Sequence, residues 1–153
     1  MDLDNFYLAP YNGGNMEHRN ILLKLWNDKA GKEYLGDLEY HIKRIRERKK
    51  DDSRNEFYIA YYGDQQNNYR PVGFIALTTM NNDFEITSGI IPEFRHQHMA
   101  ALLLEDFTEK IFESYSDIDE LTLRIKDSNV PSKKTAQLVG YVKRDREKYT
   151  LRR

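Results

Sequence analysis

One stretch of the sequence, residues 84–126, limits the possible folds more than any other. It opens with an apolar run at 84–92, continues as a helical pattern from about 98 to 115, and ends with ELTLRIK at 120–126. Apolar and polar residues alternate in that last segment, as expected for a strand with one buried face. A strand, a helix and a strand in this order predict a crossover that joins two parallel strands.

The flanking sequence predicts further strands and helices, because apolar residues recur at strand or helix spacing between polar turns. In chain order these elements are a strand at 6–11, helices at 16–28 and 33–50, strands at 56–63 and 71–80, a helix at 132–139 and a hairpin within 141–153. Strands linked by a hairpin are antiparallel, and Gly140 stands where a helix C-cap is expected.

We therefore predict one domain, residues 1–153, of the α/β (α+β) class. Its sheet is mixed and mostly antiparallel, with six to seven strands and helices on both faces. A chain of 153 residues with 39% hydrophobic content is large enough to bury one core.

Composition excludes several classes of protein. The chain has no cysteine, which excludes disulfides, thiolate metal sites and a cysteine nucleophile. Its net charge of −1 gives no general attraction to nucleic acid or membranes. No apolar run approaches the roughly 20 residues needed to span a bilayer, and the acidic N-terminus is not a signal peptide. We expect a cytoplasmic protein.

The turn between the predicted strand at 84–92 and the following helix is a candidate binding site. Backbone N–H groups at such a turn can bind an anion, and glycine usually occupies it. Here the turn contains His96 and His98. A histidine is tolerated if its φ is negative and its Cβ points away from the anion. The alternatives are that the pocket is lost, or that this His-x-His pair binds a metal, although His18 and His41 are remote in sequence.

The phrases around this turn resemble the GNAT superfamily of acyl-CoA-dependent N-acyltransferases. The family sequence Pro-x-x-Arg/Gln-Gly-x-Gly-x-Ala is matched by Pro92, Arg95 and Ala100, while the two histidines replace its glycines. The run FEITSGIIPEF is similar to a phrase of the branch that acetylates the N-termini of ribosomal and other proteins.

Downstream, NVPSKKTAQLVGY is similar to a second phrase of the family. Asn129, Ser132, Gly140 and Tyr141 hold its positions, and Ala136 replaces a tyrosine that protonates the departing thiolate in many members.

The resemblance implies acetyl transfer from acetyl-CoA to a primary amine by direct attack, without a metal, in a monomer or homodimer. It implies that the N–H of Ile90 or Ile91 polarises the thioester where the central strands splay apart. It also implies that Glu85 is the base or a water-mediated proton acceptor, and that Ser132, held by Asn129, is the proton donor to sulfur. The residues implied for coenzyme A binding are Ile90, Ile91, Arg95, His96, Gln97, His98, Met99, Ala100, Asn129 and Ser132.

Each assignment has a purely structural alternative. Glu85 is then a solvent-facing strand residue, and Asn129 and Ser132 only cap a helix. Tyr141 then belongs to the core. The aromatic residues Phe57, Tyr58, Tyr61 and Tyr62 then reflect strand propensity instead of an acceptor pocket. The alternative function is a catalytically silent GNAT-like binding module. A third reading uses the basic run 43–54 to bind an acidic partner or RNA, although a solvated helix end also explains that run.

Overall fold

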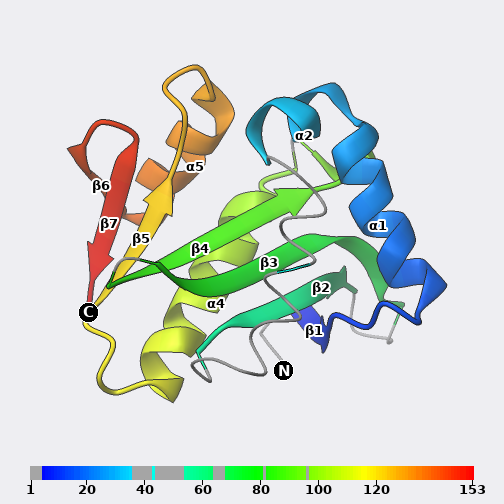
Figure 1. Cartoon of the computed structure of the whole chain (residues 1–153), viewed down its shortest axis with the longest axis horizontal. Coiled ribbons are helices and arrows are strands. Elements are labelled where there is room, and N and C mark those ends of the chain that lie inside the picture. Colours follow the sequence, from blue (N-terminus) through cyan, green and yellow to red (C-terminus); the bar gives the residue numbers. More distant parts are fainter. Residues whose placement is uncertain (1–4, 36–42, 44–53, 64–67, 81, 96) are drawn as a thin grey trace.

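The computed structural model describes residues 5–35, 43, 54–63, 68–80, 82–95 and 97–153. Seven strands within these ranges form one sheet in the order β1-β2-β3-β4-β5-β7-β6 (Figure 1). The elements are β1 Phe6–Pro10, α1 Met16–Asn27, α2 Lys29–Tyr34, β2 Glu56–Tyr62, β3 Arg70–Met80, β4 Asp83–Ile90, the 3-10 turn η1 Pro92–Phe94, α4 Met99–Ser114, β5 Glu120–Arg124, α5 Val130–Val139, β6 Val142–Asp145 and β7 Lys148–Arg152.

The sheet is mixed, as predicted. Strands β1 to β4 pair antiparallel in sequence order, and β5, β7 and β6 form a second antiparallel group. The two groups meet where β4 pairs parallel with β5, which confirms the predicted crossover through α4. Their register contains one residue pair, Glu85 with Thr122.

Helices cover both faces of the sheet, α1 and α2 on one and α4 on the other (Figure 1). Alternation along β4 and β5 creates the α4 face, because Ile86, Ile90, Leu121 and Leu123 belong to the cluster that packs on α4. The other core lies under α1 and consists of Ile21, Leu22, Leu25, Trp26, Phe57, Ile59, Phe74, Ala76 and Ile91. Four apolar residues of α1, namely Ile21, Leu22, Leu25 and Trp26, are therefore buried at helical spacing.

The short helix α2 was not predicted. It occupies Lys29–Tyr34 and shares only residues 33–34 with the helix predicted over 33–50. Asp28 starts α2 directly after α1, because its side chain accepts a hydrogen bond from the Gly31 N–H. Lys43 is helical, and the rest of 36–53 lies outside the described residues.

Gly31 allows α2 to pack closely on the end of α1. A Cβ at this position would lie 1.6 Å from the Leu25 carbonyl oxygen, a distance that no side chain permits. The α1–α2 corner is therefore fixed by a cap and a close backbone contact.

The C-terminus is fastened to the end of α4. The Arg153 guanidinium donates to the carbonyl oxygens of Phe112, Tyr115 and Ile118 at 2.5–2.7 Å, and its backbone N–H donates to Asp119 at 2.8 Å. Phe112 lies in the last turn of α4, where a helix leaves carbonyl groups without an intrahelical partner, and Tyr115 and Ile118 lie in the segment directly after it. The Arg153 side chain therefore caps this end of α4 beside its C-cap residue, Tyr115.

Candidate functional site

Strands β4 and β5 separate directly after the pair formed by Glu85 and Thr122. β4 stays paired with β3 as far as Ile90, and Figure 1 shows β5 diverging from it toward the ends of both strands. We call the wedge between residues 86–90 of β4 and the end of β5 the fork. The fork exposes one edge of β4 in the middle of the sheet.

Backbone groups of β4 point into the fork. The Ile91 N–H donates to the Val72 carbonyl of the β3 segment at 2.8 Å. Because bonded and non-bonded pairs alternate along an antiparallel ladder, the N–H and C=O groups of Ile90 and Ser88 point away from β3. Of the two predicted thioester donors, Ile91 is thus used within the sheet and Ile90 faces the fork. Ser88 was missed, because pairing parity cannot be read from sequence.

Arg95 links the turn after β4 to the α1–α2 corner. Its Nε donates to the Ile90 carbonyl at 2.9 Å, and its Nη1 lies 2.8 Å from Asp28 Oδ2. The Arg95 hydrogen bond lowers the pKa of Asp28, so this carboxylate is ionised at neutral pH. Two of the donor atoms of Arg95 are therefore occupied by the protein itself.

His98, the N-cap of α4, stands in the left-handed conformation, with φ 57° and ψ 12°. This is the conformation that glycine adopts most readily, so the turn keeps a glycine-like backbone at one of the two replaced positions. The condition that φ be negative is not met there. The His98 side chain is exposed and caps no helix N–H. His96 lies outside the described residues.

The first turn of α4 presents free donors. Among the described residues, the N–H groups of Met99, Ala100 and Ala101 have no acceptor, and the first bond of the helix runs from Leu102 to the His98 carbonyl. Such groups, with the helix dipole behind them, favour an anion. The Met99 side chain is buried in the core, so this residue offers only its backbone, whereas Gln97 is exposed.

The other arm of the fork ends at the start of α5. The Asn129 side chain accepts a hydrogen bond from the Ser132 N–H at 3.3 Å, so the predicted capping interaction is present. The Ser132 hydroxyl has no protein partner within the described ranges. Since β4 and β5 are parallel, their ends lie at the same edge of the sheet. The starts of α4 and α5 therefore flank the open end of the fork.

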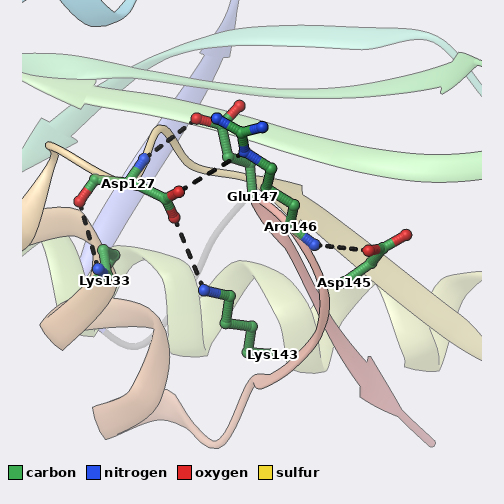
Figure 2. A network of polar contacts seen from close by, with 6 residues as sticks. All are labelled: Asp127, Lys133, Lys143, Asp145, Arg146 and Glu147. Carbon is green, nitrogen blue, oxygen red and sulfur yellow. Dashed lines mark hydrogen bonds and ion pairs between the residues drawn. The ribbon is translucent and has the colours of Figure 1, made fainter.

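A polar network holds the loop before α5 against the β6–β7 hairpin (Figure 2). The Asp127 N–H donates to Glu147 at 3.2 Å, and its carbonyl accepts from Lys133 Nζ at 3.2 Å. Its carboxylate lies 3.6 Å from Lys143 Nζ and 3.9 Å from Arg146 Nε. Asp127 thus anchors the loop through both backbone and side chain.

Helix α2 also contacts the β5 arm. Lys126 Nζ donates to the Glu33 carbonyl at 2.8 Å, and the Tyr34 hydroxyl donates to the Ser128 carbonyl at 3.3 Å. Together with the ion pair between Asp28 and Arg95, these bonds connect α2 to both arms of the fork. α2 therefore lies across the open end of the fork on one face.

Glu85 lies at the closed end of the fork and is buried, with 7% of its surface exposed. The predicted alternative of a solvent-facing residue is therefore wrong. Its Oε1 lies 2.9 Å from Arg124 Nε, and Arg124 Nη2 lies 2.9 Å from Asp83. Burial raises the pKa of Glu85, Arg124 lowers it, and Asp83 raises it further. Arg124 was missed because the sequence does not show which strand pairs with β4.

The structure does not bring all the predicted residues together. Ile90 lies five positions along the strand from Glu85, about 17 Å at roughly 3.4 Å per residue. Their side chains also point to opposite faces of the sheet. Ile90, Arg95 and the start of α4 form one group at the open end of the fork, and Glu85 lies apart from it at the closed end.

Burial places Tyr141 in the core, as its structural alternative predicted. Tyr141 is a core residue, 2% exposed, and its hydroxyl lies 2.8 Å from that of Thr108. Within the described ranges, no three His, Cys, Asp or Glu side chains are placed to hold a metal ion. None of the helices in the described part of the chain combines the length and the apolar character needed to cross a membrane.

Sequence and structure comparisons differ in outcome. No protein-family model matches the chain, and curated proteins give no match. Solved structures do match. A GNAT-family acetyltransferase from Bacillus anthracis has a TM-score of 0.74 at 11% identity, covering 99% of this chain and 97% of that chain. An acetyltransferase from Agrobacterium tumefaciens has a TM-score of 0.73 at 12% identity, covering 100% and 92%. The chain has the GNAT fold.

A third GNAT-fold neighbour contains ligands. The spermidine N-acetyltransferase from Vibrio cholerae, in complex with CoA and spermine, has a TM-score of 0.63 at 11% identity, covering 95% of this chain and 92% of that chain. The GNAT-like mixed sheet expected from the resemblance is thus confirmed. The closer relation to the branch that acetylates protein N-termini stays a prediction.

Proposed function

We propose that this protein is an N-acetyltransferase, which moves an acetyl group from acetyl-CoA to a primary amine by direct attack. The acceptor is a protein N-terminus or a small-molecule amine. The observation that carries the proposal is the fork, whose open end meets the free N–H groups at the start of α4. Spermine and CoA in the Vibrio cholerae neighbour support an amine and a coenzyme A ester as substrates of such a fold.

The fork suits the donor chemically. The pantetheine arm of coenzyme A carries two amide groups, and the backbone edge at Ser88 and Ile90 offers alternating donors and acceptors for them. The diphosphate at the end of this arm then meets the N–H groups of Met99, Ala100 and Ala101. The Ile90 carbonyl already accepts from Arg95, so its N–H is the group left for the donor.

Transfer needs two protons removed from the acceptor ammonium, one before attack and one after it, and one proton supplied to sulfur. The acceptor ammonium loses a proton to Glu85, directly or through water, and the free amine attacks the thioester carbonyl. Backbone N–H groups in the fork stabilise the oxyanion that forms, and the carbon–sulfur bond then breaks. The acceptor nitrogen then loses its second proton, which passes through the Ser132 hydroxyl to the thiolate. Ser132 thus regains its own proton, and the products are the amide and coenzyme A. The distance between Glu85 and Ile90 requires the thioester to lie toward the closed end of the fork, so water links sulfur to the Ser132 hydroxyl at the open end.

Two observations favour the silent binding module as the second candidate. Arg95 is neutralised by Asp28, which places a carboxylate beside the proposed diphosphate site. His98 also adds a Cβ at a position where a glycine-like conformation is kept, and this conformation costs a non-glycine residue about 1–2 kcal/mol. Both observations are consistent with a protein that folds but does not bind acetyl-CoA.

Substitutions at His98 separate these candidates. Asparagine and aspartate both tolerate the left-handed conformation and both cap helices. We expect His98→Asn and His98→Asp to melt at or above the temperature of the unmodified protein. Added acetyl-CoA, at 100 times its dissociation constant, raises the stability by about 2.7 kcal/mol in His98→Asn. The aspartate repels the diphosphate, so His98→Asp shows a smaller shift.

The measurement is a melting curve with and without acetyl-CoA, followed by release of free thiol with a panel of amines. If acetyl-CoA raises the melting temperature of both variants equally, the diphosphate does not bind at the start of α4. No shift in any variant at millimolar acetyl-CoA would favour the silent module. If transfer is seen, Ser132→Ala should slow it with little change in donor affinity.

A further inference from the structure

Three tyrosine rings gather on the sheet beside the first turn of α1. Tyr7 of β1 and Tyr61 of β2 are register partners, with ring centroids 6.2 Å apart and planes tilted by 55°. The ring of Tyr69 lies 6.3 Å from that of Tyr7, tilted by 58°. The rings therefore form adjoining, inclined walls instead of one flat stack.

Two of these rings are exposed, and one of them rests against the backbone. Tyr7 is 42% exposed and Tyr69 is 44% exposed. A Cβ at Gly63 would lie 2.7 Å from the ring of Tyr69, so glycine lets this ring rest against the backbone. The hydroxyl groups of Tyr7 and Tyr69 have no protein partner among the described residues. Packing and hydrogen bonding within the chain leave both rings open to a ligand.

A carboxylate adjoins the rings. Glu17 accepts a hydrogen bond from the Tyr61 hydroxyl at 2.6 Å, and no lysine, arginine or histidine of the described chain lies within ion-pair distance of it. Burial, and secondly the bond to Glu17, raises the pKa of Tyr61, so its hydroxyl remains a donor. The other oxygen of Glu17 stays available. The patch thus combines aromatic faces with an uncompensated negative charge.

We propose that Tyr7, Tyr61, Tyr69 and Glu17 form a binding site for an alkylammonium group. The faces of aromatic rings attract organic cations, and a neighbouring carboxylate adds Coulomb attraction. The site does not depend on acetyl transfer. It lies at the first turn of α1, whereas Leu25 in the last turns of that helix lies beside Gly89 at the fork. Twelve residues of helix span about 18 Å.

The test compares choline with 3,3-dimethyl-1-butanol, its neutral isostere, by NMR titration of the full chain at constant ionic strength. We expect saturable shifts of resonances in residues 7, 17, 61 and 69 with choline, and much weaker effects with the isostere. Tyr7→Leu and Tyr69→Leu should each weaken choline binding by about twofold to fivefold, the range of cation–π energies at exposed sites. Glu17→Gln should weaken it by a similar factor.

Phenylalanine variants are the matched controls. Tyr7→Phe and Tyr69→Phe keep the ring and should bind choline nearly as well as the unmodified protein. Equal shifts from choline and its isostere would show hydrophobic contact instead of an ammonium site. Equal binding by the leucine and phenylalanine variants, or no saturable shift, would also overturn the proposal. Because both tyrosines are exposed, folding of the variants can be checked from their unperturbed spectra.

Discussion

At the scale of single residues, His98 combines a side chain with a backbone conformation that glycine prefers. We expect His98→Gly to increase the free energy of unfolding by about 0.5–1 kcal/mol, because relief of strain exceeds the added entropy of the unfolded chain. His98→Ala keeps the strained conformation and serves as the control. Urea denaturation measures both. A destabilised glycine variant would mean that the imidazole contributes stability through contacts of its own.

Glu85 and Arg124 make a prediction for pH dependence. Burial raises the pKa of Glu85 above its ordinary 4.5, and Arg124 lowers it. If Glu85 is the base, kcat/KM falls as pH drops through this raised pKa. Arg124→Met removes the lowering influence, so the acid limb should move to higher pH. Arg124→Lys should largely restore its position, and a limb that stays fixed in the methionine variant would exclude Glu85 as the titrating group.

His18 makes a prediction for stability. It is buried, its Nδ1 accepts the Asn12 N–H at 3.1 Å, and burial lowers its pKa while Glu17 opposes this shift. Below about pH 6.5 the unfolded chain binds a proton that the folded chain resists, so stability should fall as pH falls. His18→Asn keeps an acceptor without titrating. Its stability should change less than that of the unmodified protein between pH 7 and 5, as measured by urea unfolding at each pH.

At the scale of elements, Gly73 sets the distance between β3 and β4 at the open end of the fork. A Cβ at Gly73 would lie 1.9 Å from the Gly89 carbonyl oxygen. Gly73→Ala must therefore displace backbone, and we expect a loss of at least about 2 kcal/mol in unfolding free energy. Gly13→Ala is the control, because its nearest neighbour atoms lie 3.9 Å away. Equal effects of the two substitutions would mean that β3 adjusts without loss.

The elements also show what the sequence could predict. Alternation in 120–126 and the repeat of Leu103, Leu104, Phe107 and Ile111 located β5 and α4 correctly, because burial on one face leaves a periodic record. The short helix α2 was missed, since the cap of Asp28 is a short-range interaction that leaves no apolar repeat in the sequence. The fork was expected only as an implication of family resemblance. Strand divergence depends on register, which leaves no periodic mark in one sequence.

At the scale of the whole molecule, Arg153 closes the chain onto α4 through its backbone N–H and three carbonyl contacts, with its guanidinium 4.9 Å from the ring centroid of Phe112. Arg153→Ala should lower the free energy of unfolding by about 1–3 kcal/mol, because hydrogen bonds from a charged donor are lost. Arg152→Ala is the control, since that side chain is exposed and makes one ion pair with Glu120. Thermal unfolding compares the two. A larger loss at residue 152 would contradict the capping role.

The candidate site could be predicted from the sequence only in part, because some of its contacts join distant segments of the chain. Motif positions identified the turn after β4 and the start of α5, but sequence could not show that Arg95 is held by Asp28 or that Glu85 is held by Arg124. Those pairings join residues far apart along the chain, and they arise only when the strands are assembled. The tyrosine patch was not predicted, because tyrosines are common in strands for reasons of strand propensity alone.

Because β4 and β5 share only the register pair of Glu85 and Thr122, we expect amide hydrogen exchange to differ between neighbouring residues of β4. The amides of Thr87, Gly89 and Ile91 point toward β3 and are hydrogen-bonded within the sheet. The amides of Ser88 and Ile90 point into the fork, where no strand is paired with them. Deuterium uptake along this strand should therefore switch between slow and fast at every second residue. A ligand bound along this edge of β4 would slow exchange at Ser88 and Ile90 and remove the alternation. Hydrogen exchange would then report binding in the fork without any measurement of catalysis.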